Sequence, residues 1–219
     1  RVRGRDRLGA IRMSVAEAGR VEVVNFGCRL NLAEGEAIRA AATRAAAPDT
    51  IVFNSCAVTD EAVRQARQAV RRALRERPDT AVVVTGCAAE LEAERFADMG
   101  ARVVANDAKG LTASYQVENI ASSSSARAEM DDAAPPPPFA LSLPKGRSSL
   151  PYLPALSGAD HARAFLGVQT GCSHSCTFCA TVLARGTARS ATVGSILTAA
   201  RTAIDRGQRE IVLTGVDLA

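Results

Sequence analysis

Short apolar runs and helical periods alternate along the first half of the chain. Each apolar run has the length and the Val-rich composition of a buried strand, and a stretch with helical spacing of apolar residues follows it. The predicted strands are 21–26, 50–53, 80–85 and 101–105, and the predicted helices lie near 33–46, 59–76, 89–98 and 108–120. Such an alternation predicts an α/β fold with a doubly wound parallel sheet and helices on both faces.

The pattern stops between 121 and 160 and resumes after it. Residues 121–160 are rich in Ser and Pro and have no sustained period, which predicts an extended linker between two domains. Beyond it the pattern predicts a strand at 164–169, a helix at 191–206 and a second strand at 210–216. One βαβ unit cannot bury both of its faces, so we expect it to begin a larger sheet or barrel.

Four segments follow from this pattern. Residues 1–12 are basic and patternless, so we expect a disordered or non-native leader, and the second domain looks truncated after its first βαβ unit. The expected segments are the leader 1–12, a first domain 13–120, the linker 121–160 and the beginning of a second domain 161–219.

Composition narrows the class of protein. Of the 219 residues 47% are hydrophobic and only 4% aromatic, so Ala, Val, Leu and Ile must fill the core, which suits helices packed on parallel strands. The net charge of +4 permits a polyanionic partner without requiring one. No run approaches the roughly 20 apolar residues of a membrane span, and no secretory signal precedes the first strand, so we expect a cytoplasmic protein without a membrane partner. In a reducing compartment the six cysteines favour metal binding or thiol chemistry over disulfides.

Three of these cysteines share one short loop. Cys172, Cys176 and Cys179 are spaced C-x3-C-x2-C directly after a predicted strand. Three thiolates can hold three irons of a [4Fe–4S] cluster and leave the fourth iron open to a small molecule. One alternative is a zinc site with His174 as the fourth ligand. Another is a closed ferredoxin-type cluster, although such clusters usually have the spacing C-x2-C-x2-C-x3-C and further cysteines nearby.

The other three cysteines, Cys28, Cys56 and Cys87, are distant in sequence but equivalent in position. Each follows a predicted strand by a few residues, so all three should meet at the carboxyl edge of the parallel sheet. Gly27 and Gly86 would let the backbone turn tightly beside a bulky cluster. The alternative for any one of them is a small buried hydrophobic side chain.

Four segments resemble the radical S-adenosylmethionine (SAM) methylthiotransferases: 27–37, 54–72, 82–90 and 168–190. The resemblance implies a flavodoxin-like domain followed by the start of a radical SAM (β/α) partial barrel, with two [4Fe–4S] clusters. The cluster on Cys172, Cys176 and Cys179 would bind and cleave SAM, with Phe178 packed near the cofactor. The cluster on Cys28, Cys56 and Cys87 would carry or donate sulfur, and a second SAM would supply the methyl group.

Within that family, the residues after Cys28 and Cys56 are most similar to the branch that acts on N6-threonylcarbamoyladenosine at tRNA position 37. The implied partners are tRNA, SAM, a sulfur donor and an electron donor. The alternatives are the branches that act on isopentenyladenosine-37 or on a ribosomal-protein aspartate, and a non-catalytic metal-binding or electron-transfer module. Since a full member would continue beyond Ala219, we expect the 219 residues alone to lack turnover.

The predicted helix 59–76 is amphipathic. Arg64, Arg67, Arg71 and Arg75 share one face by their spacing, while Val63, Ala66, Val70 and Ala73 line another that can pack on the sheet. The cationic face could contact tRNA phosphates or simply be solvated. Arg185, Gly186 and Arg189 lie just past the cysteine loop, where they could equally steer substrate or close the entrance of the barrel.

Overall fold

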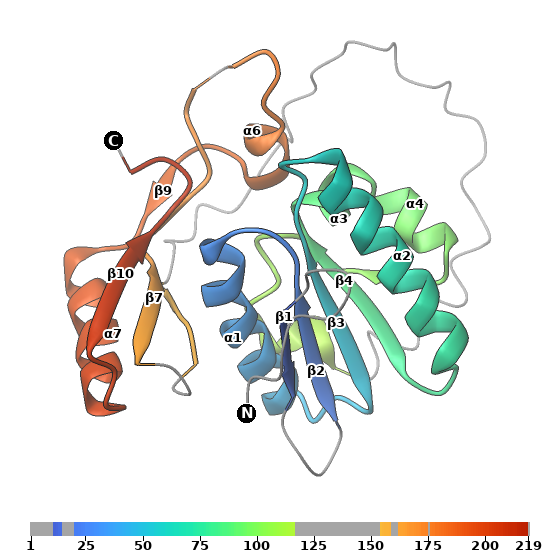
Figure 1. The fold of residues 1–219 in the computed structure, drawn as a ribbon, viewed down its shortest axis with the longest axis horizontal. Helices are drawn as coiled ribbons and strands as arrows, with labels where there is room; N and C mark the ends of the chain where they lie inside the picture. The colour runs from blue at the N-terminus through green and yellow to red at the C-terminus, as the bar shows by residue number, and fades with distance from the viewer. Residues whose placement is uncertain (1–10, 15–19, 117–153, 159–161, 175, 219) are drawn as a thin grey trace.

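A five-stranded sheet forms the centre of the first part of the protein (Figure 1). The computed structural model describes residues 11–14, 20–116, 154–158, 162–174 and 176–218. The strands stand in the order β1 (Ile11–Ser14), β2 (Val21–Asn25), β3 (Thr50–Ser55), β4 (Ala81–Gly86) and β5 (Arg102–Val103). Strands β2 to β5 run parallel, and β1 lies antiparallel to β2. The predicted α/β fold with a flavodoxin-like parallel sheet is confirmed.

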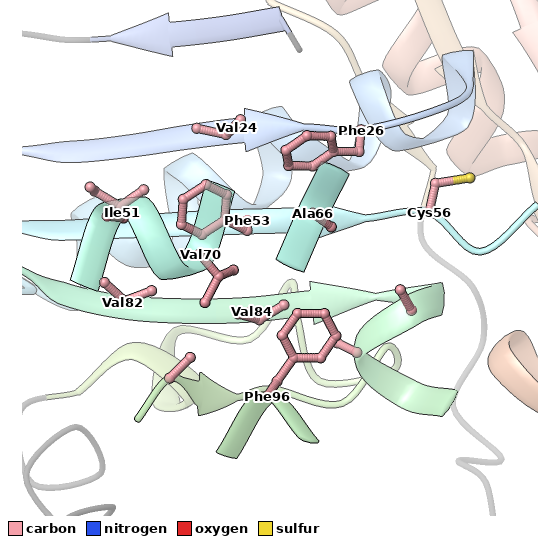
Figure 2. Packing of buried hydrophobic residues seen from close by; sticks show 14 residues of the cluster. Val24, Phe26, Ile51, Phe53, Cys56, Ala66, Val70, Val82, Val84 and Phe96 are labelled. Atoms are coloured by element: carbon pink, nitrogen blue, oxygen red, sulfur yellow. The ribbon is translucent and has the colours of Figure 1, made fainter. Parts of the chain in front are cut away.

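Helices cover both faces of this sheet. One face packs against α1 (Arg29–Arg44), and the other packs against α2 (Asp60–Glu76), α3 (Cys87–Leu91) and α4 (Ala93–Asp98). Successive residues of a strand point to opposite faces, so Val23 belongs to the α1 side and Val24 to the α2 side. Figure 2 shows the α2 side, where the rings of Phe26 and Phe53 stack with centroids 6.3 Å apart. The apolar strands are therefore buried on both faces, as parallel strands usually are.

The second part of the protein is a smaller sheet that lies beside α1 (Figure 1). Its strands stand in the order β10 (Glu210–Thr214), β7 (Arg163–Gly167) and β6 (Ala155–Leu156). The parallel strands β7 and β10 are joined through α7 (Val193–Asp205), which gives the predicted βαβ unit. A two-stranded ribbon of β8 (Gln169–Thr170) and β9 (Arg189–Ser190) and the short helix α6 (Thr181–Arg185) lie within this crossover.

A buried glutamine fixes the cysteine loop to the end of β10. Gln169 accepts hydrogen bonds from the backbone N–H groups of Val216 and Asp217 at 2.8 and 3.0 Å. Its side-chain amide donates to the carbonyl oxygens of Thr170 and Gly171. The chain that enters the loop at Cys172 is thereby held against the chain that leaves β10.

The predicted helix 108–120 is wrong over the described residues. A 3-10 helix covers only Thr112–Tyr115, and residues 117–120 lie outside the described part. The hydroxyl of Ser114 donates to the carbonyl of Ala108, and that of Tyr115 donates to the carbonyl of Lys109. Such side-chain to backbone hydrogen bonds compete with helical ones, and Gly110 weakens helix formation further.

Two further elements are shorter than the sequence predicts. The helix expected near 89–98 is interrupted at Glu92, whose backbone leaves the helical region at φ −127° and ψ 40°, so that α3 and α4 are separate. The strand expected at 101–105 keeps only Arg102 and Val103 in the sheet, at its edge.

The expected leader and linker each contribute residues to a sheet. Ile11 and Arg12 belong to β1, while residues 1–10 lie outside the described part. Ala155 and Leu156 form β6, which pairs antiparallel with β7, and most of the expected linker 121–160 lies outside the described part. Among the described helices, none combines the length and the apolar character needed to cross a membrane.

Candidate metal centre

The structure brings Cys28, Cys56 and Cys87 to one edge of the sheet, as the strand pattern predicts. Their loops follow the adjacent parallel strands β2, β3 and β4. Cys28 precedes α1 and is exposed, whereas Cys56 and Cys87 are buried. Figure 2 shows Cys56 just beyond the end of β3, at the margin of the core. Three thiols from three distant segments therefore converge at the carboxyl edge, where open α/β sheets bind ligands.

Glycines permit this convergence. Gly27 has φ +100°, and a Cβ on it would lie 2.6 Å from the sulfur of Cys56. Gly86 has φ +92°, and a Cβ there would lie 2.3 Å from the carbonyl oxygen of Ser55. No other residue type fits these two places without displacing a thiol or the backbone beside it.

Buried amides connect the start of α1 to the ends of β2 and β3. The amide of Asn31 donates to the carbonyl oxygens of Phe26 and Ser55 at 2.8 and 3.1 Å. That of Asn54 donates to the side chain of Asn25 and to the carbonyl oxygen of Asn31. The thiol of Cys28 contacts Asn31 Oδ1 at 3.6 Å. Together these hydrogen bonds fix the backbone that carries two of the three cysteines.

The thiols interact electrostatically. Burial raises the pKa of the Cys56 thiol, and the neighbouring sulfurs of Cys87 and Cys28 raise it further, while the backbone N–H of Val58 and the guanidinium of Arg185 act in the opposite direction. Mutual repulsion of this kind is relieved when a cation binds the sulfurs, since thiolates are the form that ligates metals.

A buried charged cluster of Glu34, Lys109 and Arg185 lies behind the thiols. Arg185 bonds both oxygens of Glu34 at 2.7 and 3.0 Å, and Lys109 Nζ bonds Glu34 Oε2 at 2.6 Å. Lys109 also donates to Asn106 Oδ1. Arg185 Nε donates to the sulfur of Cys87 at 3.2 Å. The cluster therefore connects α1, α6, the segment after β5 and one cysteine.

The charges in this cluster are uneven. Burial acts to raise the pKa of Glu34, but Lys109 and Arg185 overcome it and lower the pKa to about 2. Burial lowers the pKa of Lys109, and the nearby cation of Arg185 lowers it further, while the carboxylate of Glu34 acts in the opposite direction. One carboxylate thus faces two cations, which leaves positive charge next to the sulfur of Cys87.

The second set of cysteines lies on the loop after β8. Cys172 is partly buried, and Cys176 and Cys179 are exposed. The hydroxyl of Thr181 contacts the sulfur of Cys179 at 3.2 Å and lowers the pKa of that thiol. Phe178, expected to pack near a cofactor, is 92% exposed. The loop thus presents two thiols and an aromatic ring to solvent.

The sulfur of Cys172, unlike that of Cys179, lies next to a histidine and an aspartate. Its sulfur lies 3.5 Å from His174 Nδ1 and 3.5 Å from Asp217 Oδ2, and His174 and Asp217 are themselves 2.9 Å apart. Within the described residues, these three form the one group of metal-binding side chains whose ligand atoms all lie within 4.8 Å of one another. The structure brings His174 to Cys172 as the zinc alternative requires, but adds Asp217 in place of Cys176 and Cys179.

The spacing of the thiols bears on which metal group fits. A single tetrahedral zinc ion, with bonds of about 2.3 Å to sulfur, would hold its ligands roughly 4 Å apart. Neither set of three cysteines forms so tight a group in the described structure. The described thiol positions therefore do not form a three-cysteine zinc site in either set.

The arginine stripe on α2 lies where the sequence predicts. Arg64, Arg71 and Arg75 are exposed, while Ala66 and Val70 are buried against the sheet. Arg64 pairs with Glu61, and Arg67 lies 3.5 Å from Glu92 on the loop between α3 and α4. Part of the positive face is therefore neutralised by neighbours.

Several residues of the site were not predicted: Asn31, Glu34, Asn106, Lys109 and Arg185. One signal was present, because Glu34 lies between Leu30 and Ile38 on the face of α1 that the apolar period assigns to the core. A charge on such a face needs a buried partner. The local sequence around Glu34 does not indicate that this partner is Arg185, 151 residues away.

Known proteins are similar to this chain over most of its length. Residues 20–105 match the family described as uncharacterized protein family UPF0004. The chain is 35% identical over 202 residues to the threonylcarbamoyladenosine tRNA methylthiotransferase MtaB of Rickettsia prowazekii, covering 91% of this chain and 44% of that protein. It is 31% identical over 212 residues to MtaB of Bacillus subtilis, covering 87% of this chain and 42% of that protein.

A third relative has a different substrate in its name. The tRNA-2-methylthio-N(6)-dimethylallyladenosine synthase of Sphingopyxis alaskensis is 30% identical over 202 residues, covering 88% of this chain and 43% of that protein. The chain therefore spans less than half the length of each of these three relatives. Residues 20–105 therefore carry the UPF0004 domain, and most of the chain is similar to part of each of these methylthiotransferases.

Proposed function

We propose that the protein to which this chain belongs is a tRNA methylthiotransferase that converts N6-threonylcarbamoyladenosine at position 37 to its 2-methylthio derivative by radical SAM chemistry, in the cytoplasm. The observation that carries the proposal is the convergence of Cys28, Cys56 and Cys87 at the ends of three adjacent parallel strands, next to a second loop with three cysteines. The names of the Rickettsia and Bacillus relatives support this substrate.

Each set of cysteines would hold one [4Fe–4S] cluster with an open iron. Cys28, Cys56 and Cys87 would bind the first cluster, and Cys172, Cys176 and Cys179 would bind the second, where SAM would also bind. When bound, the second cluster would supply an electron, received from an external donor, for the reductive cleavage of SAM, and the first would supply sulfur. The exposed ring of Phe178 is free to pack on the adenosyl group.

Other residues of this chain would position the two cysteine sets and the tRNA without taking part in the chemical steps. Gly27 and Gly86 would let the backbone pass close to the Cys56 thiol and to Ser55, so that the three thiols can meet at one edge. Gln169 keeps the second cysteine loop against the end of β10. The exposed arginines Arg64, Arg71 and Arg75 would contact tRNA phosphates, and each lost contact should reduce the dependence of binding on salt.

Anaerobic iron loading tests the proposal. The purified chain should bind about eight irons and absorb broadly near 400 nm, and added SAM should change the spectrum. Cys56→Ser and Cys176→Ser should each retain about four irons, and only Cys176→Ser should lose the response to SAM. A colourless protein that binds zinc in place of iron would overturn the proposal in favour of a non-catalytic metal-binding module.

The substrate is tested separately. Mass spectrometry of tRNA from a strain that lacks the gene should show N6-threonylcarbamoyladenosine without its methylthio group, and the full-length gene should restore it. If the tRNA instead lacks 2-methylthio-dimethylallyladenosine, the protein acts on the substrate named for the Sphingopyxis relative. Loss of a methylthio group from ribosomal protein uS12 would assign that of a further relative, RimO of Desulforudis audaxviator.

A further inference from the structure

We propose that Arg185 is a positioning residue that docks the second cysteine loop onto the first domain and, resting on the proposed function, sets the reduction potential of the cluster held by Cys28, Cys56 and Cys87. The side chain of Arg185 is 5% exposed. It ends α6, six residues beyond Cys179, yet its guanidinium group lies among residues of the first domain.

The hydrogen bonds of Arg185 use every donor that the side chain has. Nε donates to Cys87 Sγ at 3.2 Å. Nη1 donates to Glu34 Oε1 at 2.7 Å and to Thr170 Oγ1 at 3.1 Å. Nη2 donates to Glu34 Oε2 at 3.0 Å and to Asn31 Oδ1 at 2.9 Å. A guanidinium group has five N–H bonds, so none is left over. Lysine, with three donors on one nitrogen, cannot reproduce this planar set.

These contacts join both parts of the protein at one point. Asn31 and Glu34 belong to α1 and Cys87 begins α3, whereas Thr170 ends β8. The carbonyl of Ala184, next to Arg185, accepts a further hydrogen bond from Asn106 at 2.8 Å. Helix α6 packs against α3. The position of the loop with Cys172, Cys176 and Cys179 relative to the first three cysteines therefore depends on Arg185.

The charge balance indicates the second role. Glu34 neutralises one of the two cations, Arg185 and Lys109, and the remaining positive charge is buried beside Cys87. A [4Fe–4S] cluster in its usual oxidised state carries two positive charges, and three thiolates turn that into one net negative charge. Buried charges require a partner of opposite sign, and these two would satisfy each other. Because reduction adds a further negative charge, a nearby cation should favour the reduced cluster.

Redox titration tests the electrostatic role. We would use the chain with Cys172→Ala, Cys176→Ala and Cys179→Ala, so that only the first cluster loads. Arg185→Gln should shift the midpoint potential to more negative values, and Glu34→Gln, which removes a negative charge, should shift it to more positive values. Arg185→Lys should shift the potential less than Arg185→Gln, because it keeps the positive charge but loses the planar set of hydrogen bonds. Arg201→Gln, the same charge change on the exposed side of α7, should leave it unchanged.

Hydrogen–deuterium exchange of the metal-free chain tests the docking role. Arg185→Gln and Arg185→Lys should both increase exchange at least tenfold in residues 181–185, and Arg201→Gln should not. Unchanged exchange in both Arg185 variants would overturn docking. A potential that stays the same in Arg185→Gln, or that shifts in the same direction in Glu34→Gln, would overturn the electrostatic role. If no variant and no parent chain loads iron, the proposed function fails and the electrostatic role with it, while the exchange experiment still decides docking.

Discussion

The carboxylate of Glu34 and the ammonium group of Lys109 lie 2.6 Å apart in the interior of the protein, although 75 residues separate them in sequence. Both side chains are almost fully buried. A buried ion pair is costly to break, because removal of one partner leaves an uncompensated charge away from water. Glu34 balances two cations, so its removal should change the electrostatic potential at the thiols and lower the stability of the first domain.

Acid should remove this stabilisation within a defined range. The folded pKa of Glu34, about 2, lies below its ordinary value of 4.5, so folding favours the ionised carboxylate. The stabilisation is complete above pH 4.5 and is lost as the pH falls towards 2. Urea unfolding of the metal-free chain at several pH values between 2 and 7 should show this decrease.

The variant Glu34→Gln should lower the free energy of unfolding at pH 7 by about 3 kcal/mol or more. It should also flatten the pH dependence below pH 4.5, since the group that titrates is gone. Glu61→Gln is the matched control, because that glutamate is exposed and on the surface of α2. An unfolding free energy of Glu34→Gln that equals the control at pH 7 would show that the buried cluster does not stabilise the fold.

The local sequence pattern predicted the strands and the convergence of Cys28, Cys56 and Cys87 at one edge of the sheet. It did not predict side-chain pairs between residues that are distant in sequence. Cys28, Cys56 and Cys87 follow apolar runs whose period and length are local properties, and parallel pairing then determines where their ends meet. By contrast, the pairing of Arg185 with Glu34 joins residues 151 positions apart, and no spacing rule reports it. The helix expected at 108–120 was wrong because side-chain hydrogen bonds of Ser114 and Tyr115 decided the local structure.

The space beside Gly27 offers a sharp test of the first metal centre. Gly27 and Gly100 both have positive φ, +100° and +92°, so alanine at either position carries a similar backbone strain of about 1–2 kcal/mol. Only at Gly27 would the added Cβ meet another residue, 2.6 Å from the sulfur of Cys56. We therefore expect Gly27→Ala to lose the first cluster, about four irons, and Gly100→Ala to keep it. Equal iron content in the two folded variants would show that no cluster occupies this space.

The hydroxyl of Tyr115 should contribute to stability independently of metal. Tyr115 is fully buried, and its hydroxyl donates to the carbonyl oxygen of Lys109 at 2.7 Å. Burial raises the pKa of Tyr115 well above its ordinary value, so the hydroxyl stays protonated and the hydrogen bond persists at alkaline pH. Tyr115→Phe should lower the unfolding free energy by about 1 kcal/mol with little loss of packing. Urea unfolding at pH 7 measures this difference, and an unchanged midpoint would contradict it.

The group of Cys172, His174 and Asp217 separates the two kinds of metal site that the second loop could form. If Cys172, Cys176 and Cys179 hold an iron–sulfur cluster, His174 is not a ligand, and His174→Ala should retain about four irons in that loop and the spectral response to SAM. If the loop binds a single zinc ion through Cys172, His174 and Asp217, whose ligand atoms lie within 4.8 Å, His174→Ala should lose the metal. Cys176→Ser gives the opposite results, because only the cluster needs Cys176. This variant should lose the metal of the loop if the loop holds a cluster, and should keep it if the loop binds zinc through Cys172, His174 and Asp217. Metal analysis of the two variants after identical anaerobic loading, with iron and zinc both supplied, therefore distinguishes the alternatives. Metal loss in His174→Ala together with full metal content in Cys176→Ser would reject the iron–sulfur assignment of this loop.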